Sequence, residues 1–235
     1  MLVIDKFNCA FTPICKAGSS SLILSVAEEV YDEEYIQSQK TEHGGGYNGV
    51  LRKKMHRDFQ KSPCNVQTKE KIKNYFKFAF VKNPWHRIVS ACLQFRRWID
   101  NGVEKNDFSG LHLLKMYELM NRNCSFESFV NFVKNIERNH VEYVNHHWRS
   151  QVGILQIEAL PHCKTEYDFI GKLESAQEDY SYIADKLKFK NKFIPNINHP
   201  EEYSYKDFYT NTKLIDDVGE YYTRDIDVFK YEFGK

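Results

Sequence analysis

Residues 75–90, YFKFAFVKNPWHRIVS, form the clearest strand-to-helix junction in the sequence. The alternate phenylalanines, with both faces apolar toward Val81, predict a strand buried inside a sheet. Asn83 and Pro84 end this strand, and proline suits the first position of a helix. Lys82 therefore stands at the carboxyl end of the strand, where open α/β sheets bind ligands, and Ser90 follows on the next helix. The two side chains can converge on one phosphate. A solvent-exposed lysine and a serine tolerated in a helix would give the same sequence pattern.

The rest of the sequence alternates strands with helices around this junction. Helical spacing of apolar residues begins at Ser20, directly after an apolar strand candidate and a KAGSSS run. The predicted elements are a strand within 7–14, a loop with a short helix over 40–70, helices over 109–121 and 125–138, a strand over 167–171, helices over 175–187 and 211–222, and a C-terminal tail. This alternation indicates an α/β fold with a parallel sheet. No Pro/Gly/Ser-rich linker divides the chain, so we expect a single domain over residues 1–235.

The KAGSSS run at 16–21 is the second candidate for anion binding. A strand that ends in a small-residue loop and opens a helix presents unpaired backbone N–H groups and the positive end of a dipole. Lys16 adds a charge, and Gly18 permits close backbone approach. The run is not a Walker A loop, because that motif places its lysine after the second glycine. Serines that cap a helix, with an incidental lysine, are the alternative interpretation.

Composition excludes several classes of protein. Lys+Arg number 33 against 32 Asp+Glu, which argues against a general nucleic-acid binder. The 6 cysteines show no C-x-x-C pair, so a zinc site is not indicated; we expect free thiols, with a Cys124–Cys163 bridge left open. No signal peptide or membrane span is visible, which predicts a soluble, cytoplasmic protein if the sequence is complete. Oligomeric state cannot be read from the sequence.

Two segments together resemble the sulfotransferase family that includes the Golgi carbohydrate sulfotransferases and many bacterial relatives. That family has a 5′-phosphosulfate loop with a Pro-Lys pair before small and hydroxyl residues, and a 3′-phosphate motif close to FVR-x-P-W-x-R-L-V-S. This chain has CKAGSSS at 15–21 and FVKNPWHRIVSA at 80–91. Further matches follow in the same order: HWRSQ at 147–151, YDFIGKLE at 167–174 with Asp179 beyond it, and YTRDIDVFKYEF at 222–233.

The resemblance implies a P-loop-like three-layer fold, with a central parallel sheet flanked by helices. It implies sulfuryl transfer from 3′-phosphoadenosine 5′-phosphosulfate (PAPS) to a hydroxyl, on a carbohydrate, with no metal. The residues implied to hold the 5′-phosphosulfate are Lys16, Ala17, Gly18, Ser19, Ser20 and Ser21. Lys82 and Ser90 would hold the 3′-phosphate, whereas Arg87 would pack structurally. Asn198 and residues 205–209 resemble a late loop of the family that closes over the nucleotide.

This chain departs from the family pattern at three positions. Lys82 stands where the family has arginine, which replaces a bidentate fork by a point charge. Cys15 replaces a proline before the lysine, and Cys92 replaces a common tyrosine. None of the three removes a charge that sulfuryl transfer requires.

Sulfuryl transfer needs a cation at the leaving phosphate and a base for the acceptor proton. Lys16 suits the first task, and a neutral histidine suits the second near pH 7. His56 is the first candidate, because bacterial relatives carry a histidine in a K-H-A-T motif at this place. His147 is the second, with acceptor binding as its other possible role, and His43 is the third.

Two other functions stay open at this point. One is a P-loop kinase, against which stand the position of Lys16 and the lack of a strand that ends in a magnesium-binding aspartate. The other is a nucleotide- or glycan-binding protein without catalysis, which only the change to Lys82 supports. The identity of the acceptor cannot be read from the loops at 35–70 and 100–150.

Overall fold

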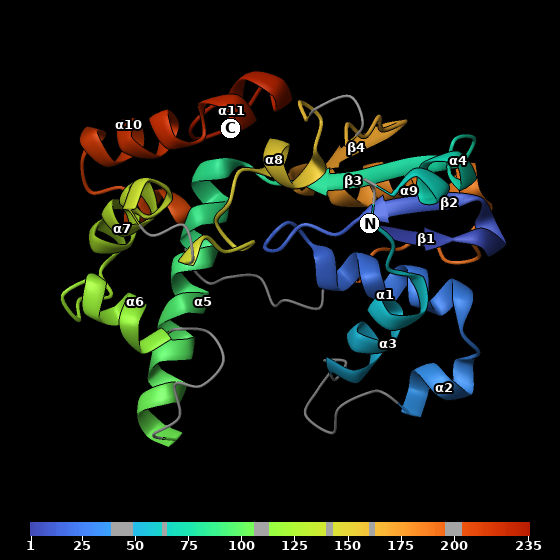
Figure 1. Ribbon diagram of the computed structural model, residues 1–235, viewed down its shortest axis with the longest axis horizontal. Helices are drawn as coiled ribbons and strands as arrows, with labels where there is room; N and C mark the ends of the chain where they lie inside the picture. The colour runs from blue at the N-terminus through green and yellow to red at the C-terminus, as the bar shows by residue number, and fades with distance from the viewer. Residues whose placement is uncertain (39–48, 63–64, 106–112, 140–142, 160–162, 196–203) are drawn as a thin grey trace. The chain divides into compact units, whose positions relative to one another are not determined.

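The computed structural model describes residues 1–38, 49–62, 65–105, 113–139, 143–159, 163–195 and 204–235 (Figure 1). The chain divides into two compact units. Unit 1 comprises Met1–Lys82 and Leu155–Glu201, and unit 2 comprises Asn83–Ile154 and Glu202–Lys235. Each unit is described here by itself. The single domain predicted over residues 1–235 stays a prediction.

Unit 1 is built on a sheet of four described strands in the order β1-β2-β3-β4 (Figure 1). β2 (Cys9–Thr12), β3 (Phe76–Val81) and β4 (Phe169–Lys172) are parallel, whereas β1 (Leu2–Ile4) pairs antiparallel with β2. The predicted α/β fold with a parallel sheet is therefore confirmed, with one antiparallel strand added at its edge. The sequence did not predict β1, because three residues are too few to show strand periodicity.

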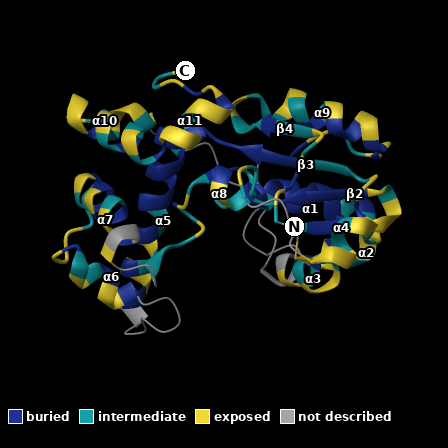
Figure 2. Cartoon of the chain, turned by 45° about the horizontal axis from the view of Figure 1, so that its top comes forward, coloured by how far each residue is buried: buried dark blue, intermediate teal, exposed yellow. Residues whose placement is uncertain are grey.

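One face of this sheet carries the main core of unit 1. Leu2, Phe11 and Phe78 lie side by side across β1, β2 and β3, and all three are fully buried. Helices α1 (Ser19–Val30), α3 (Gly49–Phe59) and α9 (Ala176–Leu187) pack apolar side chains into the same core. Figure 2 shows β1 and β2 buried and the outward faces of α3 and α9 exposed. Each buried phenylalanine contributes about 1.5–3 kcal/mol relative to an exposed one.

The opposite face of the sheet has a smaller apolar cluster. Val3 and Ala10 contact Ile72, which follows the short helix α4 (Val66–Lys71). The remaining described elements of unit 1 are α2 (Glu33–Ser38) and the 3-10 turns η1 (Asp5–Phe7) and η3 (Leu173–Ser175).

The regular elements among the described residues of unit 2 are all helices. Its elements are α5 (Pro84–Lys105), α6 (Leu113–Leu119), α7 (Phe126–Asn139), α8 (Gln151–Leu155, whose last residue belongs to unit 1), η4 (Tyr205–Phe208), α10 (Thr212–Tyr221) and α11 (Thr223–Phe229). Pro84 opens α5, as predicted. The predicted C-terminal tail is wrong at its start, because residues 223–229 form α11; Asp225 and Phe229 are the residues that this helix buries.

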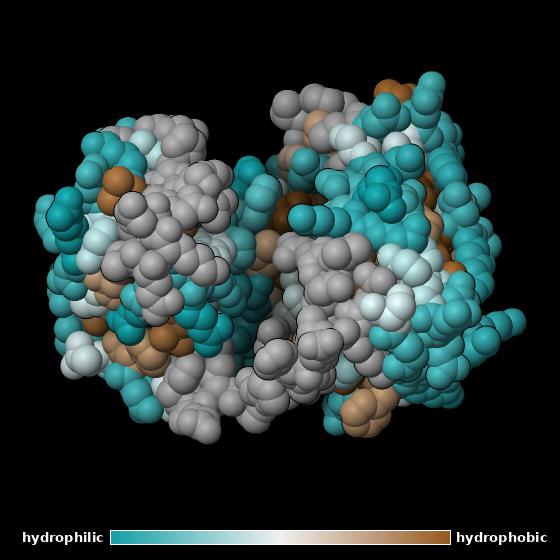
Figure 3. Space-filling view, turned by 90° about the horizontal axis from the view of Figure 1, so that it is seen from below, coloured by the Kyte–Doolittle hydropathy of each residue, from teal (hydrophilic) through white to brown (hydrophobic). Residues whose placement is uncertain are grey.

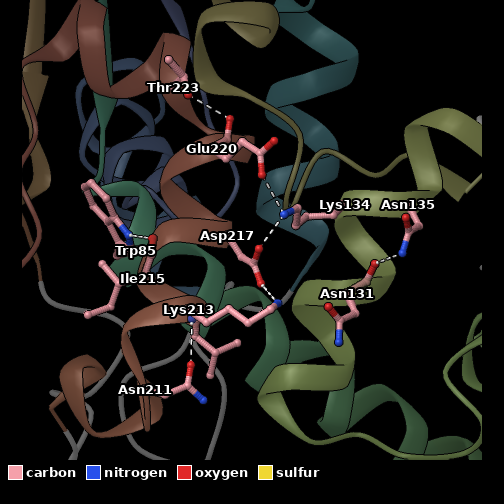
Figure 4. Close-up of polar contacts among 11 residues, drawn as sticks. Trp85, Asn131, Lys134, Asn135, Asn211, Lys213, Ile215, Asp217, Glu220 and Thr223 are labelled. Carbon is pink, nitrogen blue, oxygen red and sulfur yellow. Dashed lines mark hydrogen bonds and ion pairs between the residues drawn. The ribbon is translucent and has the colours of Figure 1, made fainter.

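A charged network joins α7 to α10 (Figure 4). Lys134 of α7 contacts Asp217 at 2.7 Å and Glu220 at 2.9 Å, and Lys213 reaches Asp217 at 2.6 Å. Hydrogen bonds from Lys134 and Lys213 hold the pKa of Asp217 below its ordinary value. Because such partly exposed pairs contribute at most about 1 kcal/mol, apolar packing carries most of the stability of this helix pair.

The cysteines differ in part from the prediction. Cys9, Cys15, Cys92 and Cys124 are free thiols, but Cys163 is in a disulfide whose partner lies outside the described residues. The prediction of free thiols is therefore wrong for Cys163, and Cys124 does not pair with it. Cysteine spacing alone does not show which cysteines a fold brings within bonding distance.

The surface of the described residues is mainly hydrophilic. On the face drawn in Figure 3, small hydrophobic areas lie among larger hydrophilic ones. No helix in the described part of the chain has the length and apolar character needed to cross a bilayer.

Candidate active site

Three parallel strands of unit 1 end at the same edge of the sheet. Their last residues are Thr12 in β2, Val81 in β3 and Lys172 in β4, and the register pairs Val81 directly with Lys172. Lys82 follows β3 at once, and Lys16 lies in the turn after β2. The structure thus brings the two predicted cationic segments to one edge, the carboxyl edge at which such sheets bind ligands.

The turn after β2 leaves backbone N–H groups without helical partners. α1 begins at Ser19, and its first helical hydrogen bond runs from the Leu22 N–H to the Gly18 carbonyl, at 3.0 Å. The N–H groups of Ser19, Ser20 and Ser21 therefore have no acceptor within the helix. Gly18 is the cap residue and no side chain caps the helix, so the serines are not the N-cap of the alternative interpretation. Free N–H groups at the positive end of a helix dipole suit an anion.

Two residues of this turn have left-handed backbone conformations. Lys16 has φ +66° and Gly18 has φ +73°. A Cβ added to Gly18 would lie 2.7 Å from Cδ1 of Leu173, the residue that follows β4. Glycine is thus required at position 18 both by the backbone and by close packing. Left-handed lysine is uncommon and costs energy, and such residues cluster at functional sites.

The YDFIGKLE segment and Asp179 shape the part of unit 1 that packs against Gly18. The Asp179 carboxylate accepts hydrogen bonds from the Lys172 N–H at 2.7 Å and the Ser175 hydroxyl at 2.8 Å. A Cβ on Gly171 would lie 2.9 Å from the ring of Phe80, so this position also needs glycine. The described contacts give this motif a structural role, which is to hold the turn after β4.

Tyr167 anchors the end of β2. Its hydroxyl lies 2.8 Å from the Thr12 hydroxyl, the last side chain before the turn that contains Lys16. Burial raises the pKa of Tyr167 to about 12, so the phenol is neutral at physiological pH. A buried neutral hydrogen bond of this kind contributes about 0.5–1.5 kcal/mol and restrains the start of the turn.

Lys82 and Lys172 differ in exposure at the shared edge. Lys82 is only 7% exposed, whereas Lys172 is half-buried. Lysine is rarely buried this deeply, so its position at a ligand-binding edge favours a functional role. Sequence reasoning missed Lys172, although it assigned the strand at 167–171. Extending that strand by one residue would have placed Lys172 at a strand end, by the rule that singled out Lys82.

Ser90 belongs to unit 2, in the second turn of α5. It is 3% exposed, and its hydroxyl donates to the His86 carbonyl at 3.2 Å. Asn83 shapes the start of the same helix, since its side-chain oxygen accepts from the Trp85 N–H at 3.1 Å. Lys82 belongs to unit 1, whereas Ser90 belongs to unit 2. The predicted convergence of these two side chains on one phosphate therefore stays a prediction.

His56, the first candidate base, lies on α3 in unit 1. Its Nδ1 is 3.0 Å from the side-chain oxygen of Gln60, which makes Nδ1 the donor and leaves Nε2 to accept a proton. Gln60 forms a bridge with Leu2, and Leu2 pairs with Phe11 near the end of β2. Gln60 is thus two strand spacings, or about 10 Å, from Phe11 of β2, on the side of β1 that faces away from β3.

His147, the second candidate, lies in unit 2. The side-chain oxygen of Asn145 accepts from the His147 backbone N–H at 3.0 Å and lies 2.6 Å from Nδ1. Nδ1 therefore carries the proton, and Nε2 can act as a base. The ring packs edge-to-face with Trp98 at 4.8 Å between centroids. His43 lies outside the described residues.

Three buried side chains fix the backbone that carries His147. Arg87, fully buried, donates to the carbonyls of His146 at 2.9 Å and Arg149 at 2.8 Å. The Tyr222 hydroxyl donates to the carbonyl of Trp148. The Asp225 carboxylate accepts from the Ser150 hydroxyl at 2.6 Å and from the N–H groups of residues 151 and 152 at 2.8 and 2.9 Å. The structural role predicted for Arg87 is confirmed.

The late segment 205–209 packs on the first turn of α5. Tyr205 stacks on His86 at 4.9 Å between ring centroids, and the Tyr209 hydroxyl donates to the Trp85 carbonyl at 2.9 Å. Burial raises the pKa of Tyr209. Asn198, the other residue assigned to this loop, lies outside the described residues. Closure over a nucleotide stays a prediction.

Comparison with known proteins decides which family carries these features. The profile described as "Sulfotransferase family" matches residues 1–232, which is nearly the whole chain. The chain belongs to the sulfotransferase family. The resemblance predicted from its motifs is therefore confirmed, and so is the family's P-loop-like α/β fold.

Several curated relatives of this sulfotransferase chain are named carbohydrate sulfotransferases. It is 30% identical to "Carbohydrate sulfotransferase 12" of Mus musculus over 62% of this chain and 37% of that protein. The Xenopus laevis protein of the same name is 29% identical over 53% of this chain and 31% of its own length. "Carbohydrate sulfotransferase 10" of Gallus gallus is 23% identical over 78% and 51%. The chain spans about a third of the length of the first two relatives. No solved structure matches it.

The two cysteines that depart from the sulfotransferase pattern have different environments. Cys92 is fully buried in α5, and burial raises the pKa of its thiol to about 12, so it acts as a small apolar side chain. Cys15 is a half-buried free thiol beside Lys16. Among the described residues of this sulfotransferase, no group of three or more His, Cys, Asp or Glu side chains is arranged to hold a metal ion.

Proposed function

We propose that this protein transfers a sulfuryl group from PAPS to a hydroxyl of a carbohydrate. The observation that carries the proposal is the carboxyl edge of the unit 1 sheet, where the free N–H groups of α1, Lys16 and Lys82 lie together. Family membership and the names of the curated relatives support it. The acceptor class rests on those names, because the described side chains do not identify a sugar.

The donor's 5′-phosphosulfate would bind at the start of α1. Lys16, Ala17 and Gly18 supply the turn, and Ser19, Ser20 and Ser21 supply N–H groups and hydroxyls. An anion fits here because no side chain caps the helix end, which leaves the first N–H groups of α1 for it. Lys82 would bind the 3′-phosphate, together with Ser90. Lys172 adds a third positive charge at the same edge.

In the reaction, the acceptor oxygen bonds to sulfur while sulfur separates from the bridging oxygen, which leaves with the 5′-phosphate of adenosine 3′,5′-bisphosphate. Lys16 would stabilise the negative charge that develops on this phosphate, an effect typically worth about 10²–10³ in rate. The acceptor proton would go to Nε2 of His56, a contribution of about 10²–10⁴. His147 has the same tautomer and is the second candidate for this proton.

Binding of the product nucleotide tests the donor site without need for an acceptor. At 100 times its dissociation constant, adenosine 3′,5′-bisphosphate should stabilise the folded protein by about 2.7 kcal/mol, which a thermal-shift measurement detects. Lys16→Ala and Ser90→Ala should each remove most of this stabilisation. Lys186→Ala, which changes an exposed lysine of α9, should keep it. No shift with the wild-type protein would refute the donor assignment.

Turnover with PAPS and a mixed glycan acceptor tests the base. His56→Ala should keep the nucleotide-induced shift but lose about 10²–10⁴ in rate. If His56→Ala keeps full activity and His147→Ala loses it, the base is His147. If both variants keep full activity, neither histidine takes the proton.

We keep the cytoplasmic location as a proposal, and the disulfide at Cys163 offers a way to test it. Structural disulfides persist in oxidising compartments and are rare in the cytosol. Labelling of free thiols in protein isolated from its native cells, with and without reductant, would show whether the disulfide forms there.

A further inference from the structure

A cavity of about 380 Å³ lies in unit 2, between the end of α6 and one face of α7. Leu119, Met120 and Asn121 line it from α6 and the turn after it. The α7 residues that line it begin at Ser128 and end at Asn139. The volume falls within the range of about 300–1,000 Å³ that is usual for small-molecule sites. None of the residues assigned to the donor or to proton transfer lies in this cavity.

Asparagines line the α7 side of the cavity. Asn131, Asn135 and Asn139 are four residues apart, so they share one face of the helix, and Ser128 extends the row. Asn135 donates to the main-chain oxygen of Asn131 at 2.9 Å (Figure 4). This bond uses one N–H of Asn135, which leaves its side-chain oxygen and the whole Asn131 amide for a ligand.

Lys134, a charged side chain of α7, points away from this row. Lys134 contacts Asp217 and Glu220 of α10, on another face of α7 (Figure 4). The nine residues that line the cavity include no Asp, Glu, Lys or Arg, although these make up 28% of the chain. Five of the nine carry a neutral amide or hydroxyl.

Apolar side chains complete the lining. Met120, Phe132 and Ile136 are 4%, 8% and 1% exposed, so they form a buried base beneath the row of amides. Among the nine described lining residues a sulfate or phosphate ligand would find no cation, and a wholly apolar ligand would leave the amides without partners. The lining therefore matches a ligand with many neutral hydroxyls or amides and an apolar C–H face.

We propose that this cavity binds an uncharged sugar unit of the acceptor glycan. The lining itself indicates a neutral saccharide. The inference rests on the proposed function only in assigning that saccharide to the acceptor. The side chains of Asn131 and Asn135 would pair with sugar hydroxyls or an acetamido group, and Leu119, the half-buried apolar residue of the lining, would contact the C–H face of the ring. The cavity would thereby select glycans by a sugar unit that does not itself receive the sulfuryl group.

The direct test is an NMR titration of ¹⁵N-labelled full-length protein with neutral trisaccharides, built from galactose, N-acetylglucosamine or N-acetylgalactosamine, up to about 10 mM. We expect at least one trisaccharide to shift the side-chain amide signals of Asn131 and Asn135. The double variant Asn131→Ala/Asn135→Ala should weaken that binding about tenfold or more, since each lost neutral hydrogen bond is worth roughly fivefold.

Asn101→Ala is the matched control, because Asn101 is an exposed asparagine of α5 outside the cavity lining. Both asparagines of the double variant are exposed helical positions where alanine is the better helix former, so the variant should fold. An unchanged melting temperature would check this. Signals at Asn131 and Asn135 that move with none of the trisaccharides, or a control that weakens binding as much as the double variant, would overturn the proposal.

Turnover separates this proposal from the proposed function. With a glycan acceptor, the double variant should raise KM about tenfold and leave kcat and nucleotide binding unchanged. Turnover by the wild-type protein without saccharide binding at the cavity would refute the sugar site and leave the proposed enzyme activity standing. Saccharide binding without any turnover would leave the site standing and count against the enzyme.

Discussion

Alanine at position 18 would test the conformation of the turn between β2 and α1. Gly18 has φ +73°, a region that costs a residue with a Cβ about 1–2 kcal/mol. The new Cβ would also lie 2.7 Å from Cδ1 of Leu173, which must move off its rotamer at about 0.5–1.5 kcal/mol. Gly18→Ala should therefore lower the free energy of unfolding by about 1.5–3.5 kcal/mol, the sum of the two contributions.

A double-mutant cycle with Leu173→Ala separates the two contributions. Truncating Leu173 removes the atom that the new Cβ would meet, so Gly18→Ala should cost only the backbone part, about 1–2 kcal/mol, in this background. Urea denaturation followed by circular dichroism gives each free energy. Gly153→Ala is the matched control, because Gly153 is helical and its Cβ would meet no atom closer than 3.8 Å.

The outcome depends on the packing of the turn against η3. A coupling free energy near zero between positions 18 and 173 would show that the two do not contact in solution. Gly18→Ala with unchanged stability would refute the left-handed turn itself. The same turn presents the N–H groups proposed to bind the donor. The double-mutant cycle should therefore also be measured with adenosine 3′,5′-bisphosphate present.

Three further predictions follow from buried or paired groups. Asp225→Ala leaves at least three donors without their charged acceptor and should cost about 3 kcal/mol or more in urea denaturation, whereas the exposed Asp227→Ala should change stability by less than about 0.5 kcal/mol. The pKa of Asp217 is lowered by Lys134, so its stabilisation is complete above the ordinary pKa of 3.8 and is lost as pH falls through the lower folded value. The stability gap between wild type and Asp217→Asn, about 0.5–1 kcal/mol at pH 7, should accordingly shrink as denaturation is repeated from about pH 4 toward pH 2; a gap independent of pH would contradict it. Tyr167→Phe should lower the free energy of unfolding by about 0.5–1.5 kcal/mol with an unchanged m-value, and a neutral result would show that the bond to β2 does not hold the turn.

Much of the fold could be predicted because its central segments have strong local patterns. The alternating phenylalanines give β3 within about one residue of its observed bounds, and the proline gives the start of α5 but not its end at Lys105. α1, α7, α9 and α10 were likewise predicted from apolar periodicity. β1 and α2 are short, and a short element shows too little of its period to be recognised. α11 was taken for a tail because it is only 7 residues long, and the spacing of Ile226 and Phe229 alone is too short a pattern to identify a helix.

The candidate site could be predicted only in part. Two strand ends with adjacent lysines are visible in the sequence, and parallel pairing then brings Lys16 and Lys82 to one edge. The contact of Gly18 with Leu173 joins residues more than 150 positions apart, and no local pattern shows such a pair. For the same reason, the hydrogen bonds from Arg87 and to Asp225 were not foreseen in detail. The free thiol predicted at Cys163 is wrong, because the spacing of cysteines in the sequence carries no information on their distance in the fold.

The way in which Arg87, Tyr222 and Asp225 hold residues 146–152 has an evolutionary consequence. Apart from the Ser150 hydroxyl and the Gln151 side-chain amide, the described partners of these three side chains are carbonyl and N–H groups, which every substitution except proline preserves. The path of the segment is therefore independent of which side chains project at 146, 147 and 149. Natural variation, or a designed library at these three positions, can exchange chemistry there while the supporting architecture stays constant.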